Sequence, residues 1–586
     1  MFGIILFMDR KKLIEPALYV VLIIALLAPR LPSLGSFSTL DEPYWLSMGA
    51  NFYYALGQRE FQNTVYEYQP AVTTMWIVTA AMLVYFPEYR GMGQGYLDYN
   101  KGGLDLFMIE HDKHPMELLI ISRMIQILLI TALFLILYSL LKRFVPKFVS
   151  AFAVIFASLD PFFLSQSRLL DHEAMLSLFV MISVLALAIY CLQERRFIFL
   201  LLSGVSAGLA QLTKSSAIAI LAPVGVLFLI QIYQERREGL IHALVKTVKT
   251  FVIWLMLLAA AYIVFWPGMW VAPQKMIYEV YGNAFSYAFQ GARLSAAGEL
   301  ESSRFNLNLN FSGIFSLIEV ILRRTTPLTW LGVLFGLSFP FTRAPEWNSA
   351  RRQLFLPFWV TALAFVIMFG IAQGRNSPHY ILCSYLALNL LAGLGWSHII
   401  KLFVDRFPTV GAQGFQYGIL SILLFLQFWS AAAFFPYYFT YQNPILYQYK
   451  RNEDFPLFPY GEGLEQAAQY LAGLPNATAS TALVYYSRGC FSYFYPGKTI
   501  GFRPYYVDGL HGQDLIHSIR SSDYIVVYYA VQGGVESYKG YIEALSGMKP
   551  IHEVWLDGRK YVVIYQVDQI PESILKILSN LKPVTQ

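Results

Sequence analysis

Long apolar runs constrain this chain more than any other feature of its sequence. A helix needs about 18 or more consecutive apolar residues to cross the hydrocarbon core of a bilayer. Runs of this kind recur at residues 13–30, 117–141, 148–166, 173–192, 197–213, 216–233, 248–266, 327–341, 354–372, 380–398 and 415–436. The composition agrees, because 56% of the residues are hydrophobic and only 14% are charged. We therefore predict a polytopic α-helical membrane protein with about eleven transmembrane helices.

The charged turns between these runs predict the topology. If a further apolar run at 70–87 does not span, the turns on the N-terminal side hold Lys142, Arg143, Lys147, Arg195, Arg196, Arg236, Arg237, Arg343, Arg351, Arg352, Lys401 and Arg406. The opposite short turns then hold only Arg168, Lys214 and Arg375. Basic residues in short loops stay cytoplasmic. We therefore expect a cytoplasmic N-terminus, an extracytoplasmic C-terminus, and an interfacial or re-entrant helix at 70–87.

Two long outer loops and a C-terminal region complete the predicted organisation. The loops at 31–116 and 267–326 are rich in aromatic residues, which favours helices lying in the membrane interface. After residue 436 the chain alternates helix-like stretches (464–474, 515–521, 538–545) with β-rich ones (481–486, 524–529, 561–567). We predict a transmembrane domain at 1–436 and a small extracytoplasmic α/β domain at 437–586.

Two adjacent carboxylates, Asp41 and Glu42, follow the first apolar run by about ten residues. A chain this apolar rarely places two acids beside a membrane surface for solubility alone, so we interpret them as a catalytic pair. The alternative is structural. Thr39 or Asp41 could cap a helix that begins at residue 42, with a favourable acid in its first turn.

Each short outer turn also carries a cation, on the side where cations are scarce. Arg168 and Asp171 share the first turn, Lys214 lies in the second, and Arg375 and His379 lie in the third. Charges at membrane depth often mark a substrate path, and converging Arg and Lys side chains suit a phosphate. The alternatives are an i, i+3 ion pair between Arg168 and Asp171, a snorkelling Lys214, and interfacial hydrogen bonds from the third turn.

Glycosyl transfer from a polyprenyl-phosphate sugar would use both sets of residues. Its leaving group is a phosphate, whose developing charge needs cations. The acceptor hydroxyl needs a base, for which we favour Asp41, while Glu42 would hold the sugar or the acceptor. A single in-line displacement inverts the anomeric carbon. Arg168, Asp171, Lys214, Arg375 and His379 would then bind the donor phosphate and sugar.

Few residues of the sequence indicate a metal or a further partner. His111-Asp112-Lys113-His114 resembles a ligand cluster, but a solvated loop explains it better, so no metal is assigned and a divalent ion stays an alternative. Three scattered cysteines cannot form a disulfide framework. The net charge of +6 is small for 586 residues and argues against nucleic acid. The bilayer is the first expected partner.

The ordered motifs resemble the dolichyl-phosphate-mannose protein mannosyltransferases and their bacterial relatives, including the lipid A aminoarabinose transferase. The resemblance is carried by Leu40-Asp41-Glu42, Ser167-Arg168-Leu169-Leu170-Asp171, the stretch from Gly208 to Lys214, the stretch from Phe265 to Trp270, His379-Tyr380, the stretch from Pro436 to Pro444, and the stretch from Tyr460 to Leu464. It implies a GT-C fold, Asp41 as base, and a donor cavity lined by Arg168, Asp171 and Lys214. The loop 267–326 contains no inserted domain of the eukaryotic kind, which weakens the case for a Ser/Thr protein acceptor.

The sequence therefore predicts an enzyme of the plasma (inner) membrane that uses a polyprenyl-phosphate-linked sugar, with mannose as one candidate. The acceptor could be a protein, a lipid or a glycan at the outer face. Two other classes stay open. A transporter or flippase of a lipid-linked sugar would also place charges near the membrane, although no repeated halves are evident. A non-catalytic membrane protein could bind glycans through its outer domain.

Overall fold

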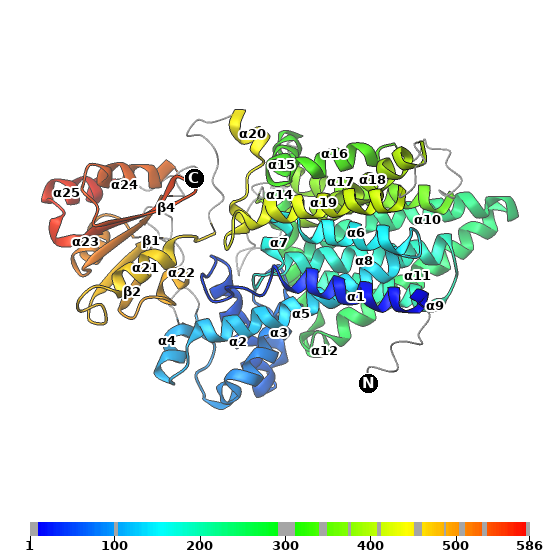
Figure 1. Cartoon of the computed structure of the whole chain (residues 1–586). Coiled ribbons are helices and arrows are strands. Elements are labelled where there is room, and N and C mark those ends of the chain that lie inside the picture. Colours follow the sequence, from blue (N-terminus) through cyan, green and yellow to red (C-terminus); the bar gives the residue numbers. More distant parts are fainter. Residues whose placement is uncertain are drawn as a thin grey trace, which may run out of the picture. The chain divides into compact units, whose positions relative to one another are not determined.

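The computed structural model describes residues 10–98, 103–290, 311–338, 349–372, 377–406, 412–449, 460–485, 488–502, 510–529 and 536–581. The chain divides into two compact units (Figure 1). The first unit consists of Met1–Pro32, Phe52–Ala80 and Arg123–Tyr449. The second consists of Ser33–Asn51, Ala81–Ser122 and Lys450–Gln586.

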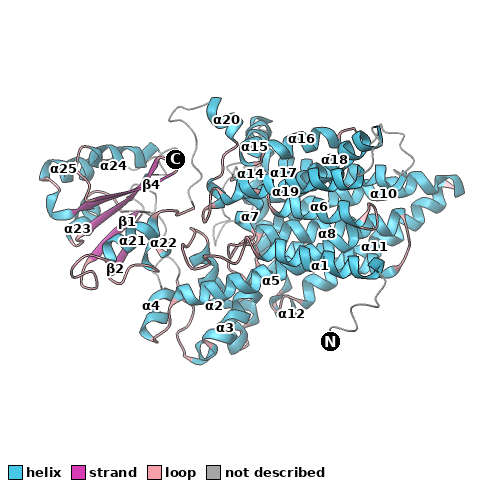
Figure 2. Cartoon of the chain, in the orientation of Figure 1, coloured by secondary structure: helices cyan, strands magenta, loops and turns pink. Residues whose placement is uncertain are grey.

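Helices make up the described part of the first unit (cyan in Figure 2). The longer ones that run through it are α1 (Arg10–Leu27), α3 (Val72–Tyr85), α5 (Pro115–Leu141), α6 (Lys147–Ser158), α8 (Glu173–Leu192), α9 (Phe197–Thr213), α10 (Leu221–Glu235), α11 (Leu240–Val264), α15 (Phe311–Arg324), α16 (Pro327–Gly336), α17 (Ser349–Ile371), α18 (Leu382–Arg406) and α19 (Ala412–Ala432). Shorter pieces are α7 (Pro161–Gln166), α12 (Gly268–Val271), α13 (Pro273–Ile277), α14 (Asn283–Gln290) and α20 (Pro444–Tyr449). Each of the eleven predicted apolar runs coincides with helix.

Seven helices of the described residues are long and apolar enough to cross a membrane. They lie at Pro115–Leu141, Glu173–Leu192, Ser215–Glu235, Leu240–Val264, Arg352–Ile371, Pro378–Arg406 and Gln413–Ala432. Four other predicted runs form shorter apolar helices, in α1, α6, α9 and α16. The predicted polytopic helical fold is confirmed, whereas eleven as the number of spans stays a prediction.

The helices of the first unit pack around α8, which is apolar on all sides and buried along nearly its whole length. Such a helix belongs at the centre of a bundle, and α8 packs against α9 and α18. Small residues allow other helices to approach closely. At the crossing of α16 and α18, a Cβ atom on Gly395 would lie 2.0 Å from the carbonyl oxygen of Gly332.

Helix α3 coincides with the apolar run at 70–87, which the charge pattern predicts to be interfacial or re-entrant and not to span the membrane. It has 14 residues, so its length is about 21 Å at 1.5 Å per residue. A bilayer core is about 30 Å thick. The length of α3 agrees with a helix that does not span, and the topology itself stays a prediction.

The second unit contains one five-stranded sheet of order β2-β1-β3-β5-β4. The strands are β1 (Thr481–Tyr485), β2 (Lys498–Phe502), β3 (Tyr524–Tyr528), β4 (His552–Leu556) and β5 (Arg559–Gln566). β1 pairs in parallel with β2 and β3, whereas β5 pairs antiparallel with β3 and β4. The predicted small α/β region is confirmed, with β2 and β4 added to the three strands expected from the sequence.

Helices pack on this sheet and bury an apolar core. They are α21 (Leu464–Ala472), α22 (Gly489–Ser492), α23 (Gln513–Arg520), α24 (Glu536–Ser546) and α25 (Glu572–Asn580). The unit also takes in parts of the predicted outer loop 31–116, including the start of α2 (Glu42–Gln58) and α4 (Gly103–Glu110). The predicted boundary at residues 436 and 437 stays a prediction.

Candidate functional site

The acidic pair lies in the second unit, where a short loop leads into α2. Oε2 of Glu42 accepts hydrogen bonds from the backbone N–H and the hydroxyl of Thr39, both at 2.8 Å. The backbone N–H of Trp45 donates to the carbonyl of Asp41 at 3.0 Å, which begins the helix. This reach of an acid back to an N–H three residues earlier is one half of a capping box. The structural alternative therefore describes Glu42 well.

Asp41 and Glu42 differ in their access to solvent. Glu42 is fully buried, whereas Asp41 is only partly buried. A general base must come within hydrogen-bond reach of a substrate proton. The loop therefore presents Asp41, while Glu42 fixes the conformation of the loop.

Contacts with the C-terminal part of the chain hold this loop inside the second unit. The N–H of Leu40 donates to the carbonyl of Tyr460 at 2.9 Å. Pro43 packs so closely on Gly489, the first residue of α22, that a Cβ there would lie 2.4 Å from its ring. Glu462 is buried and accepts from the Tyr528 hydroxyl at 2.8 Å. The stretch from Tyr460 to Leu464, which the sequence singled out only by resemblance, thus supports the acidic loop.

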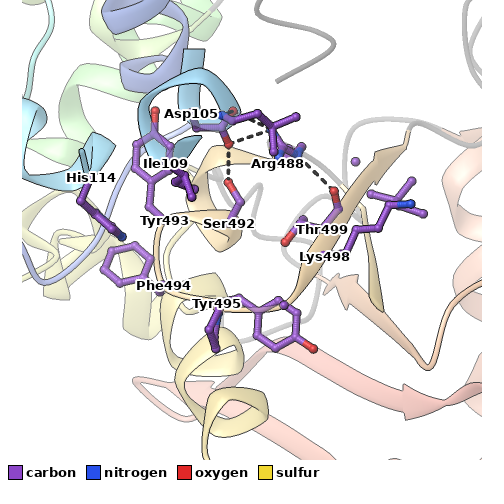
Figure 3. A pocket seen from close by; sticks show the side chains of 15 residues that line it. Asp105, Ile109, His114, Arg488, Ser492, Tyr493, Phe494, Tyr495, Lys498 and Thr499 are labelled. Atoms are coloured by element: carbon purple, nitrogen blue, oxygen red, sulfur yellow. Dashed lines mark hydrogen bonds and ion pairs between the residues drawn. The ribbon is translucent and has the colours of Figure 1, made fainter. Parts of the chain in front are cut away.

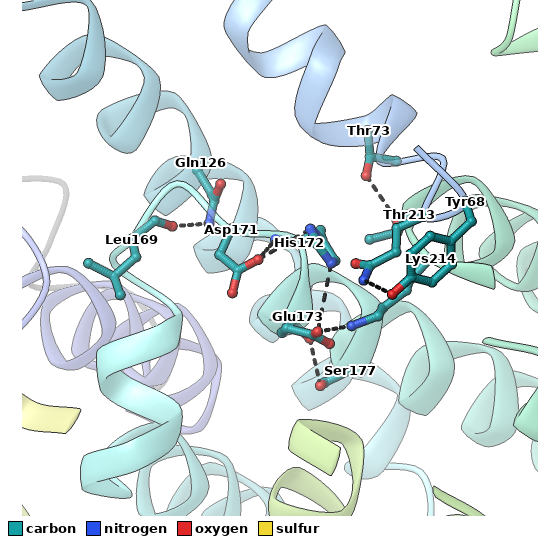
Figure 4. A network of polar contacts seen from close by, with 11 residues as sticks. Tyr68, Thr73, Gln126, Leu169, Asp171, His172, Glu173, Ser177, Thr213 and Lys214 are labelled. Carbon is teal, nitrogen blue, oxygen red and sulfur yellow. Dashed lines mark hydrogen bonds and ion pairs between the residues drawn. The ribbon is translucent and has the colours of Figure 1, made fainter. Parts of the chain in front are cut away.

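Lys214 lies in the first unit, at the end of α9, and is only 2% exposed. Figure 4 shows its ammonium directed at the carboxylate of Glu173, with which it forms a hydrogen-bonded ion pair. The ammonium also lies 4.2 Å from the centre of the Tyr380 ring, a cation–π contact. Lys214 is therefore a buried, paired cation and not a snorkelling side chain at the surface.

His172 and Asp171 continue the same network at the start of α8 (Figure 4). The ring of His172 lies 3.2 Å from Asp171 at Nδ1 and 3.7 Å from Glu173 at Nε2. The Asp171 carboxylate also accepts from the His172 N–H at 2.6 Å. Burial, and then the positive charge of Lys214, lower the pKa of His172 well below its usual value. The ring is therefore neutral at pH 7, and the network brings Asp171 and Lys214 into one buried cluster.

Arg168 has a different environment in the same unit. Its guanidinium donates to the carbonyls of Pro436, at 3.2 Å, and Pro32. The rings of Phe435 and Tyr438 lie 5.7 and 5.3 Å from it. These contacts join three segments that are far apart in sequence, so Arg168 has a structural role here. A role toward the donor stays a prediction.

The third predicted turn is only partly described. Arg375 lies outside the described residues. His379 is partly buried, and its ring stands edge-on to that of Tyr380 at 4.4 Å between centres. Because Tyr380 contacts Lys214, the structure brings His379 close to the Lys214 cluster.

Sequence reasoning missed three residues of these sites. Glu173, the partner of Lys214, is the first residue of the apolar run at 173–192, and an acid at the start of that run was the available signal. The sequence indicated Tyr380 only as part of the motif His379-Tyr380. Arg30 is fully buried in the turn after α1 and donates to the Ser167 hydroxyl at 2.8 Å.

The His111–His114 stretch does not form a metal centre in the described structure. The ring of His111 stacks on Phe107, with 4.3 Å between centres, and its Nδ1 lies 2.8 Å from the Phe107 carbonyl. Among the described residues, no three His, Cys, Asp or Glu side chains are grouped as metal ligands. These residues give no basis for assigning a metal.

Comparison with known proteins addresses the middle of the chain. Residues 108–277 match the model of the dolichyl-phosphate-mannose-protein mannosyltransferase family. The resemblance is confirmed over this segment. A curated relative, dolichyl-phosphate-mannose–protein mannosyltransferase 5 of Saccharomyces cerevisiae, is 26% identical over 172 residues. The match covers 29% of this chain and 19% of the length of that relative.

Three solved structures to which the chain is similar at low sequence identity are given next. ArnT from Cupriavidus metallidurans bound to undecaprenyl phosphate gives a TM-score of 0.49 at 12% identity, over 97% of this chain and 99% of that one. The oligosaccharyltransferase AglB from Archaeoglobus fulgidus gives 0.48 at 12% identity, over 91% and 71%. The Pmt1–Pmt2 complex of S. cerevisiae gives 0.34 at 14% identity, over 52% and 38%. The family segment 108–277 includes Arg168, Asp171 and Lys214.

Proposed function

We propose that this protein is a membrane glycosyltransferase that moves a sugar from a polyprenyl-phosphate carrier to an acceptor at the outer face. One observation carries the proposal. The segment that matches a mannosyltransferase family also contains the buried Lys214 cluster. Charged groups buried in a membrane protein are retained mostly for function. The family description makes mannose the first sugar to test.

Lys214 is the proposed ligand of the donor phosphate. The phosphodiester of the donor carries one negative charge, and the departing polyprenyl phosphate carries two. A buried cation stabilises this added charge strongly, because it acts in a medium of low dielectric constant. Glu173 holds the ammonium in place before the donor binds. Asp171 and His379 are the proposed sugar-facing residues beside it, and Arg168 and Arg375 stay candidates for the phosphate.

Asp41 is the proposed general base. It removes the proton from an acceptor hydroxyl as the oxygen attacks the anomeric carbon. The bond from that carbon to the phosphate oxygen breaks, and the polyprenyl phosphate leaves with the electron pair, so the configuration inverts. In this proposal Glu42 is a positioning residue, because it is buried and hydrogen-bonded to Thr39.

The test is transfer from radiolabelled polyprenyl-phosphate-mannose by the full chain in nanodiscs containing native acceptors. General base catalysis contributes about 10²–10⁴-fold. We expect Asp41→Asn to lower kcat by this factor with donor binding kept, and Asp568→Asn, an exposed acid of the same unit, to be unaffected.

Lys214→Met should instead weaken donor binding, with Lys249→Met on the exposed face of α11 as its control. Equal turnover by Asp41→Asn and the wild type would remove Asp41 from the mechanism. If the wild type transferred sugar from no polyprenyl-phosphate donor, the transporter and the non-catalytic glycan-binding classes would replace the enzyme.

The proposed setting is the plasma (inner) membrane, with the N-terminus in the cytoplasm and the C-terminal unit outside. The proposed partners are the lipid-linked sugar donor, the bilayer, and an acceptor that is a protein, a lipid or a glycan. Positive charge in the short turns supports this orientation.

A further inference from the structure

The backbone before Asp41 contacts two residues from the C-terminal part of the second unit, Tyr460 and Gly461. The N–H of Leu40 donates to the carbonyl of Tyr460 at 2.9 Å. Gly461 has a φ of +98°, which favours glycine, and a Cβ atom on it would lie 3.4 Å from the carbonyl oxygen of Ser38. Tyr460 and Gly461 therefore set the path of the chain just before the proposed base.

The chain after the acidic pair packs on α22. Pro43 contacts Gly489, the first residue of this helix, where a Cβ atom would lie 2.4 Å from the proline ring. An ion pair holds the same helix to α4, because Nη1 of Arg488 lies 2.8 and 2.7 Å from the two carboxylate oxygens of Asp105 (Figure 3). The hydroxyl of Ser492 donates to this carboxylate at 3.1 Å, beside a cavity of about 660 Å³ in the second unit. The acidic loop is therefore held on both of its sides.

A buried carboxylate fixes the positions of Tyr460 and Gly461. Glu462 is 2% exposed, and its Oε2 accepts from the N–H of Tyr460 at 2.7 Å and from the hydroxyl of Tyr528 at 2.8 Å. This hydroxyl in turn accepts from the N–H of Gly461 at 3.1 Å. Tyr528 is fully buried and belongs to β3, the central strand of the sheet. Through Tyr528 and Glu462, the sheet thus determines where the two residues that contact the acidic loop lie.

A second buried acid, Glu465, acts on the sheet side of the same stretch. It is 1% exposed and accepts from the N–H of Gly463 at 3.1 Å, at the start of α21. A Cβ atom on Gly463 would lie 3.2 Å from Val554 of β4. The residue that Glu465 binds therefore packs on the sheet, whereas the residues that Glu462 fixes contact the acidic loop.

We propose that Glu462 is a positioning residue that holds Asp41 in place for proton abstraction. This role rests on the proposed function, in which Asp41 is the general base. A misplacement of about 1 Å can lower a reaction rate about 10²-fold. Without the Glu462 carboxylate, Tyr460 and the loop bonded to it lose their fixed position. The competing explanation is that Glu462 only stabilises the fold of the second unit.

The first test is transfer from radiolabelled polyprenyl-phosphate-mannose by the full chain in nanodiscs containing native acceptors. Glu462→Ala should lower kcat by about 10–10²-fold. Donor binding should be kept, because the proposed phosphate ligand Lys214 belongs to the first unit. Glu462→Gln should recover most of the lost kcat, since its amide oxygen can accept the same two hydrogen bonds. A purely structural role would change the thermal midpoint and not the kcat of the folded protein.

Two matched controls belong to this test. Glu465→Ala removes the other buried carboxylate, and Tyr565→Phe removes the hydroxyl of a buried tyrosine on β5, 3.3 Å from the Tyr529 hydroxyl. Both should keep the kcat of the wild type, whereas Tyr528→Phe, which also removes one buried hydroxyl, should lower it. Equal losses of kcat in Glu465→Ala and Glu462→Ala would overturn the proposal.

A double variant tests whether Glu462 acts through Asp41. Residues that act as one unit give non-additive losses, whereas independent effects on a rate multiply. In the Asp41→Asn background, Glu462→Ala should therefore cause no further loss of kcat. Losses that multiply in the double variant would contradict a role through Asp41.

Hydrogen exchange reports the order of the loop without any turnover. The N–H of Leu40 is bonded to the carbonyl of Tyr460, so it exchanges faster when that contact loosens. Mass spectrometry of the peptide 38–45 should show faster exchange in Glu462→Ala and not in Glu465→Ala. Exchange at the wild-type rate in both variants would show that Glu462 does not fix the loop.

The outcomes separate this role from the proposed function. If Asp41→Asn lowers kcat and Glu462→Ala does not, the enzyme stands and the positioning role fails. If Asp41→Asn turns over like the wild type, the proposed base is wrong and Glu462 has no base to position. If no polyprenyl-phosphate donor supports transfer, both proposals fail, and faster exchange at Leu40 then leaves Glu462 a structural residue of the loop.

Discussion

Breaking the buried pair of Lys214 and Glu173 should destabilise the first unit strongly. Their side chains are 2% and 1% exposed. Removing one partner of a buried pair leaves an unpaired charge and costs about 3–5 kcal/mol. After Glu173→Leu the ammonium keeps the Tyr380 ring at 4.2 Å, and a desolvated cation–π contact contributes about 2 kcal/mol. We therefore expect Glu173→Leu to lower the free energy of unfolding by about 3 kcal/mol, at the lower end of this range. Lys214→Met should lower it by more.

The double variant Lys214→Met with Glu173→Leu should recover most of this loss. Replacing both members of a buried pair by apolar side chains is often neutral or stabilising. The control is the pair of Lys560 and Glu553 in the second unit, whose side chains are 35% and 28% exposed. Surface pairs contribute about 0–1 kcal/mol, so its single variants should hardly differ from the wild type.

The assay is unfolding by SDS in mixed micelles, followed by tryptophan fluorescence. If the double variant loses as much stability as the sum of the two single variants, the residues are not coupled and the reasoning is refuted. The recovered double variant also separates fold from function. Loss of donor binding in a folded double variant assigns Lys214 to the phosphate, whereas normal donor binding leaves it a purely structural cation.

Three further predictions concern the packing of a glycine, the protonation of His172 and the membrane topology. Gly395→Ala would place a methyl group 2.0 Å from the Gly332 carbonyl oxygen and should lower the free energy of unfolding by about 1–3 kcal/mol. The control Gly418→Ala, whose methyl group would lie in open space within α19, should raise the thermal midpoint. Equal thermal midpoints for the two variants would contradict the close packing at Gly395. The pKa of His172 is lowered in the folded state, so its contribution to stability is present above pH 6.5 and lost as the pH falls. Stability should therefore fall between pH 7.5 and 5.5, and thermal unfolding of His172→Asn should lack this fall. An unchanged profile would contradict the neutral, buried ring. The three native cysteines are buried and should not react with a maleimide. A cysteine introduced by Lys549→Cys, on the exposed surface of the second unit, should react with an impermeant maleimide on intact cells. Labelling only after permeabilisation would show that the topology is the reverse of the predicted one.

The sequence predicted much of the fold because its strongest signals are local. Hydropathy within a window of about 18 residues locates an apolar helix without knowledge of its neighbours, and each of the eleven runs coincides with helix. The three strands richest in β-branched and aromatic residues were also predicted. β2 and β4 were missed because Lys498–Phe502 contains a glycine and His552–Leu556 mixes charged with apolar residues. Only pairing with β1 and β5 makes them strands.

The sequence alone also selected the residues that carry the candidate chemistry, because a charge stands out in a chain this apolar. The sequence did not reveal the partners of these charged residues. Glu173 and Lys214 are 41 residues apart, Arg168 and Pro436 are 268 apart, and Asp105 and Arg488 are 383 apart. Pairings of this kind depend on which helix faces meet, and no local window records that.

The tertiary structure likewise distinguished the two adjacent acids, since it buries Glu42 against Thr39 and leaves Asp41 partly exposed. The sequence determined where the helices, the strands and the rare charges stand along the chain. Packing alone determined which charges are neutralised, which carboxylate is presented, and that a cavity forms beside α22.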